Sequence, residues 1–306
     1  MTVIAICAAT FQRPRGLTAL LDSLKRLEIP PGVELRTVVV DNDPDASARP
    51  IMERASRTWP HADLRYAVEE QRGIPFARNC SIRAAGDFDW AAFIDDDAVA
   101  DPAWIRHLYE TAEAFHAEVV TGAVIPVYEV EPPQWIKAGH FFERTRFPTG
   151  TPLHYARTTN ALVAARWLAG GSPFNEAMAN NGGDDTHLFR RIHLAGGKIV
   201  WSDEAIVLET VPKTRLSAQW LIKREYRRGN SRSLCLRDLE DSPVRRAKRL
   251  AAAAVHSGAG VGLMALAPVR GRQSLVLGAQ RVALSAGLVS GLTGHVYEEY
   301  SVVHGS

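Results

Sequence analysis

The chain has 306 residues, of which 46% are hydrophobic and 23% are charged, and its formal net charge is +2. These values are ordinary for a soluble globular protein, and they exclude a collagen-like chain, a long disordered chain and a small disulfide scaffold. Three scattered cysteines, Cys7, Cys80 and Cys235, are too few for a disulfide framework or a zinc cage. With no secretory signal recognisable at the start, they predict a reducing, cytoplasmic setting.

The first 130 residues alternate between strand and helix patterns. Apolar runs of strand length cover residues 2–10, 34–41, 64–68, 90–94 and 119–127. Leucines at helical spacing follow the first run, a second helix is expected from Pro75 to Gly86, and a third from Asp101 to about Phe115. Repeated strand–helix–strand units predict an α/β fold with a mostly parallel sheet flanked by helices. Such sheets bind ligands beyond the carboxyl ends of their strands.

The second half of the chain is more varied. Residues 128–157 are rich in proline and aromatic side chains and are expected to form irregular surface structure. We then predict a strand at 158–164, a turn at 180–183, a helix at 187–195, short strands at 198–201 and 205–208, and a basic helix at 216–228. Residues 213–249 carry twelve Lys and Arg against four Asp and Glu, so this segment needs an anionic partner.

The C-terminal tail has a different composition. No residue from Leu250 to Val269 is charged, and the second run, at 274–294, contains one charged residue, Arg281. One interpretation is a pair of helices packed on the catalytic body. The other is a monotopic membrane anchor with the basic residues of 245–249 at the lipid headgroups. The missing charged face favours membrane contact.

Three consecutive carboxylates, Asp95, Asp96 and Asp97, follow the apolar strand at 90–94. Like charges at this spacing repel unless a cation lies between them, and hard oxygen ligands suit Mg²⁺ or Mn²⁺. The alternative is a solvated turn that caps the following helix. Asp41 also ends a strand, so it is expected to reach the same crevice.

A second pair of carboxylates, Asp184 and Asp185, lies at a predicted helix start after two glycines. One of them would suffice as the N-terminal cap, which leaves the other to act as a general base. Basic residues at 223, 224, 227 and 228 suit a leaving diphosphate or lipid phosphates, or else form a solvated face. No glycine-rich phosphate loop is present, which argues against ATPases and nicotinamide enzymes, and nothing in the pattern indicates nucleic-acid binding.

These segments resemble family 2 glycosyltransferases of the GT-A fold, which is Rossmann-like. The matching stretches, in order, are ATFQRP, VVVDND, EEQRGIPFARN, FIDDDAVADPAW, TTNALV, GGDDTHLFRR and KREYRRGNS. The pattern is most similar to the succinoglycan-biosynthesis type of β-glucosyltransferase. The resemblance implies a GT-A domain over residues 1–230, with a nucleotide-sugar half at about 1–127 and an acceptor half at about 128–230. Residues 231–306 then form a helical, membrane-associating segment.

The resemblance also implies roles for individual residues. Asp185 would be the catalytic base, and Asp97 would bind Mg²⁺ or Mn²⁺, with Glu209 a weaker candidate ligand where the family often has a histidine. Asp184, which replaces the family's usual Glu, and Asn160 would lie at the acceptor or support the base. The donor would be bound by Thr10, Arg13, Asp41, Arg72, Arg78, Asp95, Arg227 and Arg228.

The function implied is inverting, metal-dependent transfer of a hexose, with glucose expected, from a UDP-sugar to a lipid-linked saccharide in cell-surface polysaccharide biosynthesis. The Gln-x-x-Arg-Trp signature of processive synthases is absent, so single sugar addition is expected. The enzyme would lie peripherally on the inner face of a bacterial membrane. Two alternatives are a sugar-nucleotide pyrophosphorylase, which would need a glycine-rich N-terminal loop, and a non-catalytic nucleotide-sugar-binding scaffold.

Overall fold

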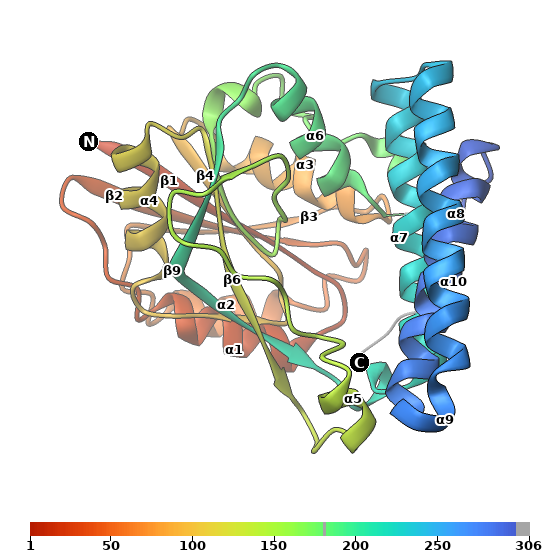
Figure 1. Ribbon diagram of the computed structural model, residues 1–306. Helices are drawn as coiled ribbons and strands as arrows, with labels where there is room; N and C mark the ends of the chain where they lie inside the picture. Colours follow the sequence, from red (N-terminus) through yellow and green to blue (C-terminus); the bar gives the residue numbers. More distant parts are fainter. Residues whose placement is uncertain (180–181, 298–306) are drawn as a thin grey trace.

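The computed structural model describes residues 1–179 and 182–297, which form a sheet domain with long C-terminal helices standing beside it (Figure 1). Nine strands within these residues form one sheet, in the order β3-β2-β1-β4-β8-β6-β9-β5, and β7 pairs with β9. The strands are β1 (Thr2–Thr10), β2 (Val33–Asp41), β3 (Asp63–Val68), β4 (Trp90–Ile94), β5 (Ala98–Ala100), β6 (Val119–Tyr128), β7 (Pro152–Leu153), β8 (Asn160–Ala164) and β9 (Ile199–Val211).

The sheet is parallel through its first half and mixed beyond it. β1 pairs in parallel with β2 and β4, β2 with β3, and β6 with β9, whereas β8 runs antiparallel between β4 and β6. The parallel N-terminal sheet expected from the strand–helix alternation is confirmed. The two short strands expected at 198–208 are one strand, β9, whose pairing with β6 shifts register after Gly122.

Helices cover both faces of the sheet. They are α1 (Pro14–Leu24), α2 (Arg49–Ser56), α3 (Ile74–Ala85), α4 (Trp104–Phe115), α5 (Gln134–Ala138), α6 (Asp184–Leu194), α7 (Ala218–Leu239), α8 (Pro243–Ala265), α9 (Ala267–Arg270) and α10 (Arg272–Leu292).

The two faces of β1 show why the parallel strands are apolar throughout. Ile4 and Ile6 pack in one core with α1 and α4, and Ala5 and Cys7 pack in a second core with α3 and α6. A strand buried on both sides has no polar face, so its sequence is a continuous apolar run rather than an alternating one. The flanking helices expected from the sequence are therefore confirmed.

The prediction of irregular surface structure at 128–157 is wrong in part. The segment contains α5 and β7, and Ile136 and Phe141 are buried against Leu221 of α7 and Val276 of α10. These contacts fasten the C-terminal helices to the sheet domain. The aromatic residues are needed because a segment without regular hydrogen bonding stays in place only through its side-chain contacts.

The C-terminal helices pack through glycines. A methyl group at Gly287 of α10 would overlap the Tyr226 carbonyl of α7, and one at Gly229 would overlap the Leu284 carbonyl. On its other side α10 approaches α8 through Gly278 and Gly260. α10 therefore lies between α7 and α8 at backbone contact distance. The predicted domain boundary at residue 230 falls inside α7, which is continuous.

Candidate active site

The site lies at the carboxyl end of β4, next to that of β1. The three carboxylates Asp95, Asp96 and Asp97 occupy the turn between β4 and β5. β5 pairs with β9 so that Ala98 lies opposite Glu209, and the Thr210 amide donates to the Asp97 carbonyl at 2.9 Å. This register brings Glu209 beside the carboxylate turn from a point 112 residues further along the chain.

Asp96 turns away from its neighbours and is only 4% exposed. Its carboxylate accepts a 2.8 Å bond from the Thr10 hydroxyl and a 2.9 Å bond from Arg13 Nη1. Burial raises the pKa of Asp96 to about 6, and Arg13 partly opposes that shift. Thr10 and Arg13, both predicted to bind the donor, are thus held at the β1 end of the site by Asp96.

The raised pKa of Asp96 predicts a pH effect on stability. A carboxyl group whose pKa is higher in the folded state loses stabilisation as the pH rises from about 4 to about 6. Compared with Asp96→Asn, the unsubstituted protein should therefore gain unfolding free energy as the pH falls from 6.5 to 4.5. Urea unfolding of both proteins at the two pH values measures this; a pH-independent difference would contradict it.

Asp95 and Asp97 point into the site. Asp95 accepts a 2.7 Å bond from the Thr159 hydroxyl and lies 3.3 Å from Arg78 Nη2. Asp97 Oδ2 lies 3.3 Å from Arg215 Nη2. Burial and the adjacent charge of Asp95 raise the pKa of Asp97. The turn therefore presents two carboxylates that are close to each other and partly compensated by cations.

Arg78 joins this turn to the second carboxylate pair. Its Nη1 donates to Asp184 at 2.5 Å, across from its contact with Asp95. Burial opposes the positive charge of Arg78, but Asp184 and Asp95 raise its pKa above the ordinary value. The guanidinium thus fixes the start of α6 against the end of β4.

The two adjacent carboxylates at the start of α6 have different surroundings. Asp184 is 3% exposed and paired with Arg78, whereas Asp185 is half-buried. Asp185 Oδ1 accepts bonds from the Thr186 amide at 2.6 Å and the Thr186 hydroxyl at 3.2 Å. Among the described residues none donates to Asp185 Oδ2. Gly183, with φ of 99°, provides the left-handed turn that leads into the helix; Asn180 and Asn181 of the predicted turn lie outside the described residues.

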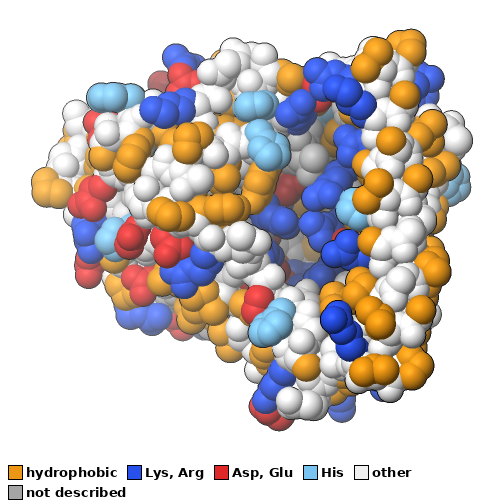
Figure 2. Space-filling model, viewed as in Figure 1, with side chains coloured by type: hydrophobic (Ala, Val, Ile, Leu, Met, Phe, Trp, Pro, Cys, Tyr) orange, Lys and Arg blue, Asp and Glu red, His pale blue; other side chains and the backbone are white. Residues whose placement is uncertain are grey.

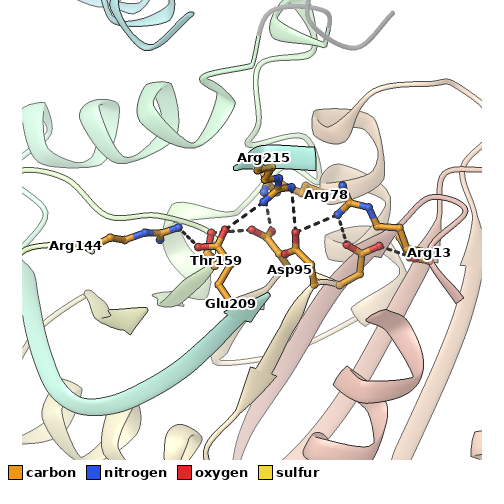
Figure 3. A network of polar contacts seen from close by, with 10 residues as sticks. Arg13, Arg78, Asp95, Arg144, Thr159, Glu209 and Arg215 are labelled. Carbon is orange, nitrogen blue, oxygen red and sulfur yellow. Dashed lines mark hydrogen bonds and ion pairs between the residues drawn. The ribbon is translucent and has the colours of Figure 1, made fainter. Parts of the chain in front are cut away.

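Glu209 lies between two arginines (Figure 3). Arg144 forms a short ion pair with one carboxylate oxygen, and Arg215 Nη1 lies 3.9 Å from the other. Burial raises the pKa of Glu209, and these cations oppose the shift. The structure therefore brings Glu209 together with Asp97, as a metal role would require, and also gives it protein cations as partners.

The donor set suits a divalent ion that the substrate helps to bind. In the described part of the chain, no three His, Cys, Asp or Glu side chains are placed to hold a metal by themselves. Mg²⁺ and Mn²⁺ are commonly bound through one or two carboxylates, with waters and substrate phosphates completing the shell. The crowded pair Asp95 and Asp97 fits this kind of site, in which Asp97 would be the ligand and Glu209 would lie beside the ion.

Two predicted donor residues lie at the other end of the crevice. Asp41 is fully buried, and its carboxylate accepts bonds from the Ala48 amide at 2.7 Å and the Tyr66 hydroxyl at 3.0 Å. Asp41 therefore shapes the loop after β2, and its buried carboxylate has no surface left to contact the nucleobase of a donor. Arg72 is exposed, and its guanidinium lies 4.9 Å from the centre of the Phe11 ring.

Asn160 lies in the core rather than at the acceptor. Its side chain accepts a 2.8 Å bond from Trp104 Nε1 and donates to the carbonyls of Ala123 and Ala205. The residue is fully buried, so it ties β8 to β6, β9 and α4. Its neighbour Thr159 makes the contact with the site, which the sequence interpretation assigned to the wrong residue of the TTNALV stretch.

Arg227 and Arg228 are consecutive on α7 and project in different directions. Arg228 donates to Glu225 at 2.7 Å and shares a stripe with Arg224, four residues earlier. Sequence reasoning also missed Arg144 and Arg215. Arg144 lies in the segment taken as irregular, and Arg215 ends a short 3₁₀ turn before α7, so neither belongs to a periodic pattern.

Comparison with known proteins agrees with this geometry. The profile of glycosyl transferase family 2 matches residues 5–169. The succinoglycan biosynthesis protein ExoM of Rhizobium meliloti is 34% identical over 297 residues, covering 95% of this chain and 92% of that protein. The glucosyl-dolichyl phosphate glucuronosyltransferase of Haloferax volcanii is 23% identical over 249 residues, 75% of each chain.

Solved structures share the fold. The mannosyltransferase PcManGT from Pyrobaculum calidifontis, in complex with GDP-Man and Mn²⁺, gives a TM-score of 0.65 at 18% identity over 94% of this chain and 86% of that one. Residues 1–349 of S. aureus TarS, in complex with UDP-GlcNAc, give a TM-score of 0.57 at 16% identity, covering 97% of this chain and 93% of that one. The GT-A-like architecture, the family and the resemblance to a succinoglycan protein predicted from the motifs are confirmed: the chain is a member of glycosyltransferase family 2.

Proposed function

We propose that this glycosyltransferase transfers a single hexose, with inversion, from a UDP-sugar to a lipid-linked saccharide in cell-surface polysaccharide biosynthesis. The observation that carries the proposal is the Arg78 bridge. Its guanidinium pairs with both Asp95 and Asp184 and so holds the start of α6, which carries Asp185, against the carboxylate turn. Membership of the family sets aside the pyrophosphorylase and scaffold alternatives. The relation to ExoM, named for succinoglycan biosynthesis, supports the saccharide acceptor.

The two carboxylates at the start of α6 have different roles in this proposal. Arg78 neutralises Asp184, so Asp185 is the carboxylate available to take the proton of the acceptor hydroxyl. The acceptor oxygen then bonds to the anomeric carbon as the bond from that carbon to the diphosphate breaks. One displacement inverts the configuration, so an α-linked donor gives a β-glycoside.

Cations around the turn would balance the charge of the leaving UDP. Arg13 and Arg215 both lie 3.3 Å from Asp97, at the place where a diphosphate would approach the carboxylates. A divalent ion held by Asp97 would supply further positive charge to the diphosphate. Arg228 would add a guanidinium from α7, on the opposite side of the cleft.

The test is UDP release from a panel of UDP-, GDP- and dTDP-sugars with Mn²⁺ or Mg²⁺, using a bacterial lipid extract as acceptor. Release from one UDP-sugar only, lost with EDTA, is the expected result. Mass spectrometry of the product should show one added hexose. Release from a GDP- or dTDP-sugar instead, or a ladder of added hexoses, would contradict the proposal.

Membrane attachment through α8 is part of the same proposal. Leu250, Val255 and Val261 of α8, with Leu266 just after its end, are 43% to 71% exposed, and no charged residue lies between them in the sequence. By length and composition α10 would reach across a bilayer, but 44% of its apolar window is buried in the protein. The apolar outer face of α8 with the basic residues before it favours docking in the plane of an anionic membrane surface.

Two charges on this face should release the protein from vesicles. Val255→Glu with Val261→Glu adds negative charge at exposed positions, so binding to phosphatidylglycerol–phosphatidylethanolamine vesicles should fall at least roughly tenfold with the fold intact. Val127→Glu on β6, a position 45% exposed, is the matched control and should bind normally. Co-sedimentation measures both; equal binding of all three proteins would exclude α8 as the docking face.

A further inference from the structure

A stripe of arginines runs along the side of α7 that faces the sheet domain. Arg224, Arg228 and Arg232 follow one another at intervals of four residues, so they lie on one face of the helix. At 1.5 Å per residue the stripe is about 12 Å long. Figure 2 shows a hollow between the sheet domain and the C-terminal helices, with Lys and Arg side chains gathered along it.

Two arginines of the sheet domain face this stripe. Burial, together with the charges of Arg144 and Arg228, lowers the pKa of Arg157 to about 10. Arg157 is half-buried on the loop before β8, and the negative charge of Asp185 acts to raise its pKa. The stripe, Arg144 and Arg157 therefore lie around one space, with the candidate base at its edge.

Carboxylates compensate only part of this cluster. Arg224 and Arg228 share Glu225, and Arg144 pairs with Glu209. Within residues 1–179 and 182–297, the guanidinium groups of Arg157 and Arg232 have neither a carboxylate at ion-pair distance nor a hydrogen bond to the protein. In the same residues Arg144 Nη1 is buried without a hydrogen-bond partner. Guanidinium groups gathered in this way repel one another, and an anion with several oxygen atoms bound between them would offset that repulsion.

The ion pairs of the carboxylate turn involve Arg13, Arg78 and Arg215 rather than Arg157 or Arg232. Arg13 and Arg215 already compensate Asp97, where the donor diphosphate is proposed to bind. Arg232 is one helical turn beyond Arg228 and remains exposed. Partial desolvation and the charges of Arg228 and Arg249 lower its pKa, and Glu225 opposes this shift. One diphosphate at the turn therefore leaves the Arg232 end of the stripe without an anion.

We propose that Arg157 and Arg232, on opposite walls of the cleft, form a second binding site for a diphosphate group. The inference rests on the proposed function, because a lipid-linked saccharide brings a second diphosphate into the same cleft as the donor. Placed beside Asp185, this group would hold the acceptor with its hydroxyl at the base. The source of the diphosphate is either the acceptor lipid or an extended binding mode of UDP, and the two are separable by experiment.

Calorimetric titration of the full chain tests the site without turnover. Geranyl diphosphate, added in the presence of saturating UDP, serves as the acceptor probe, and UDP with Mn²⁺ serves as the donor probe. Arg157→Gln and Arg232→Gln should each weaken the binding of geranyl diphosphate roughly tenfold or more, and should change the binding of UDP less than about twofold. Arg237→Gln, on the same helix but beside Gly294, is the matched control and should bind both probes normally.

Each outcome has a defined meaning. Weaker binding of geranyl diphosphate alone assigns the site to the diphosphate of the acceptor. Weaker binding of UDP alone supports a diphosphate site that is occupied by the donor. Unchanged binding of both probes in both variants overturns the inference. Sugar transfer by the unsubstituted protein is measured separately, so absence of transfer counts against the proposed function and leaves the binding result standing. Melting temperatures equal to that of the unsubstituted protein confirm that each variant is folded.

Discussion

Replacing Asp185 by Asn should lower kcat by roughly 10²- to 10⁴-fold, the usual contribution of a positioned general base. The amide cannot take the proton of the acceptor hydroxyl, but it retains the shape of the side chain and both bonds to Thr186. Donor binding should therefore be unchanged, since Asp95, Asp96 and Asp97 of the carboxylate turn keep their charges. Initial rates at saturating donor and acceptor, with UDP titration in parallel, measure the two quantities separately.

The neighbouring carboxylate provides a contrast. Asp184→Asn breaks the pair with Arg78 and leaves a buried guanidinium with one partner fewer, so it should lower the melting temperature. Asp185→Asn should leave the melting temperature almost unchanged, because Asp185 is half-buried and pairs with no cation at close range among the described residues. If Asp185→Asn keeps full activity, the base lies elsewhere.

The second large effect is expected at Asp97. Asp97→Asn should lower turnover a hundredfold or more and remove the dependence of UDP binding on Mn²⁺, since a metal at a leaving diphosphate contributes several kcal/mol. Glu209→Gln should have a smaller effect, because Arg144 and Arg215 already engage that carboxylate. UDP titrations with and without Mn²⁺ separate the two variants. Full activity of the unsubstituted enzyme in EDTA would remove the metal role altogether.

The strands and their acidic ends were predictable from the sequence. The limits of β1 and β4 agree with the apolar runs at 2–10 and 90–94, because strands buried on both faces leave a continuous apolar signal. The place of Asp95 and Asp97 at the site follows from the rule that ligands bind at the carboxyl ends of parallel strands. The approach of Asp184 to Asp95 depends instead on the Arg78 bridge. The expected membrane location and sugar specificity stay predictions.

The arginines of the cleft were much harder to predict. Arg144 and Arg157 come from a segment whose only visible signal is its proline and aromatic content, and tertiary contacts alone place them. Asp96 was grouped with its neighbours, although a turn after a strand sends consecutive side chains in different directions. Asp41 was expected to bind the donor because it ends a strand, yet it lies at the start of a tight loop, where its oxygens accept bonds from backbone amides.

The glycine contacts between α7 and α10 have a mechanical consequence. Where backbones touch, no flexible side chain can absorb a shift of one helix against the other. Gly229 of α7 and Gly287 of α10 make this contact, and α10 is joined in the same way to α8 through Gly278 and Gly260. If α8 docks on a membrane surface as proposed, a tilt of α8 would be transmitted through these contacts to Arg228 and Arg232 and would change the width of the cleft.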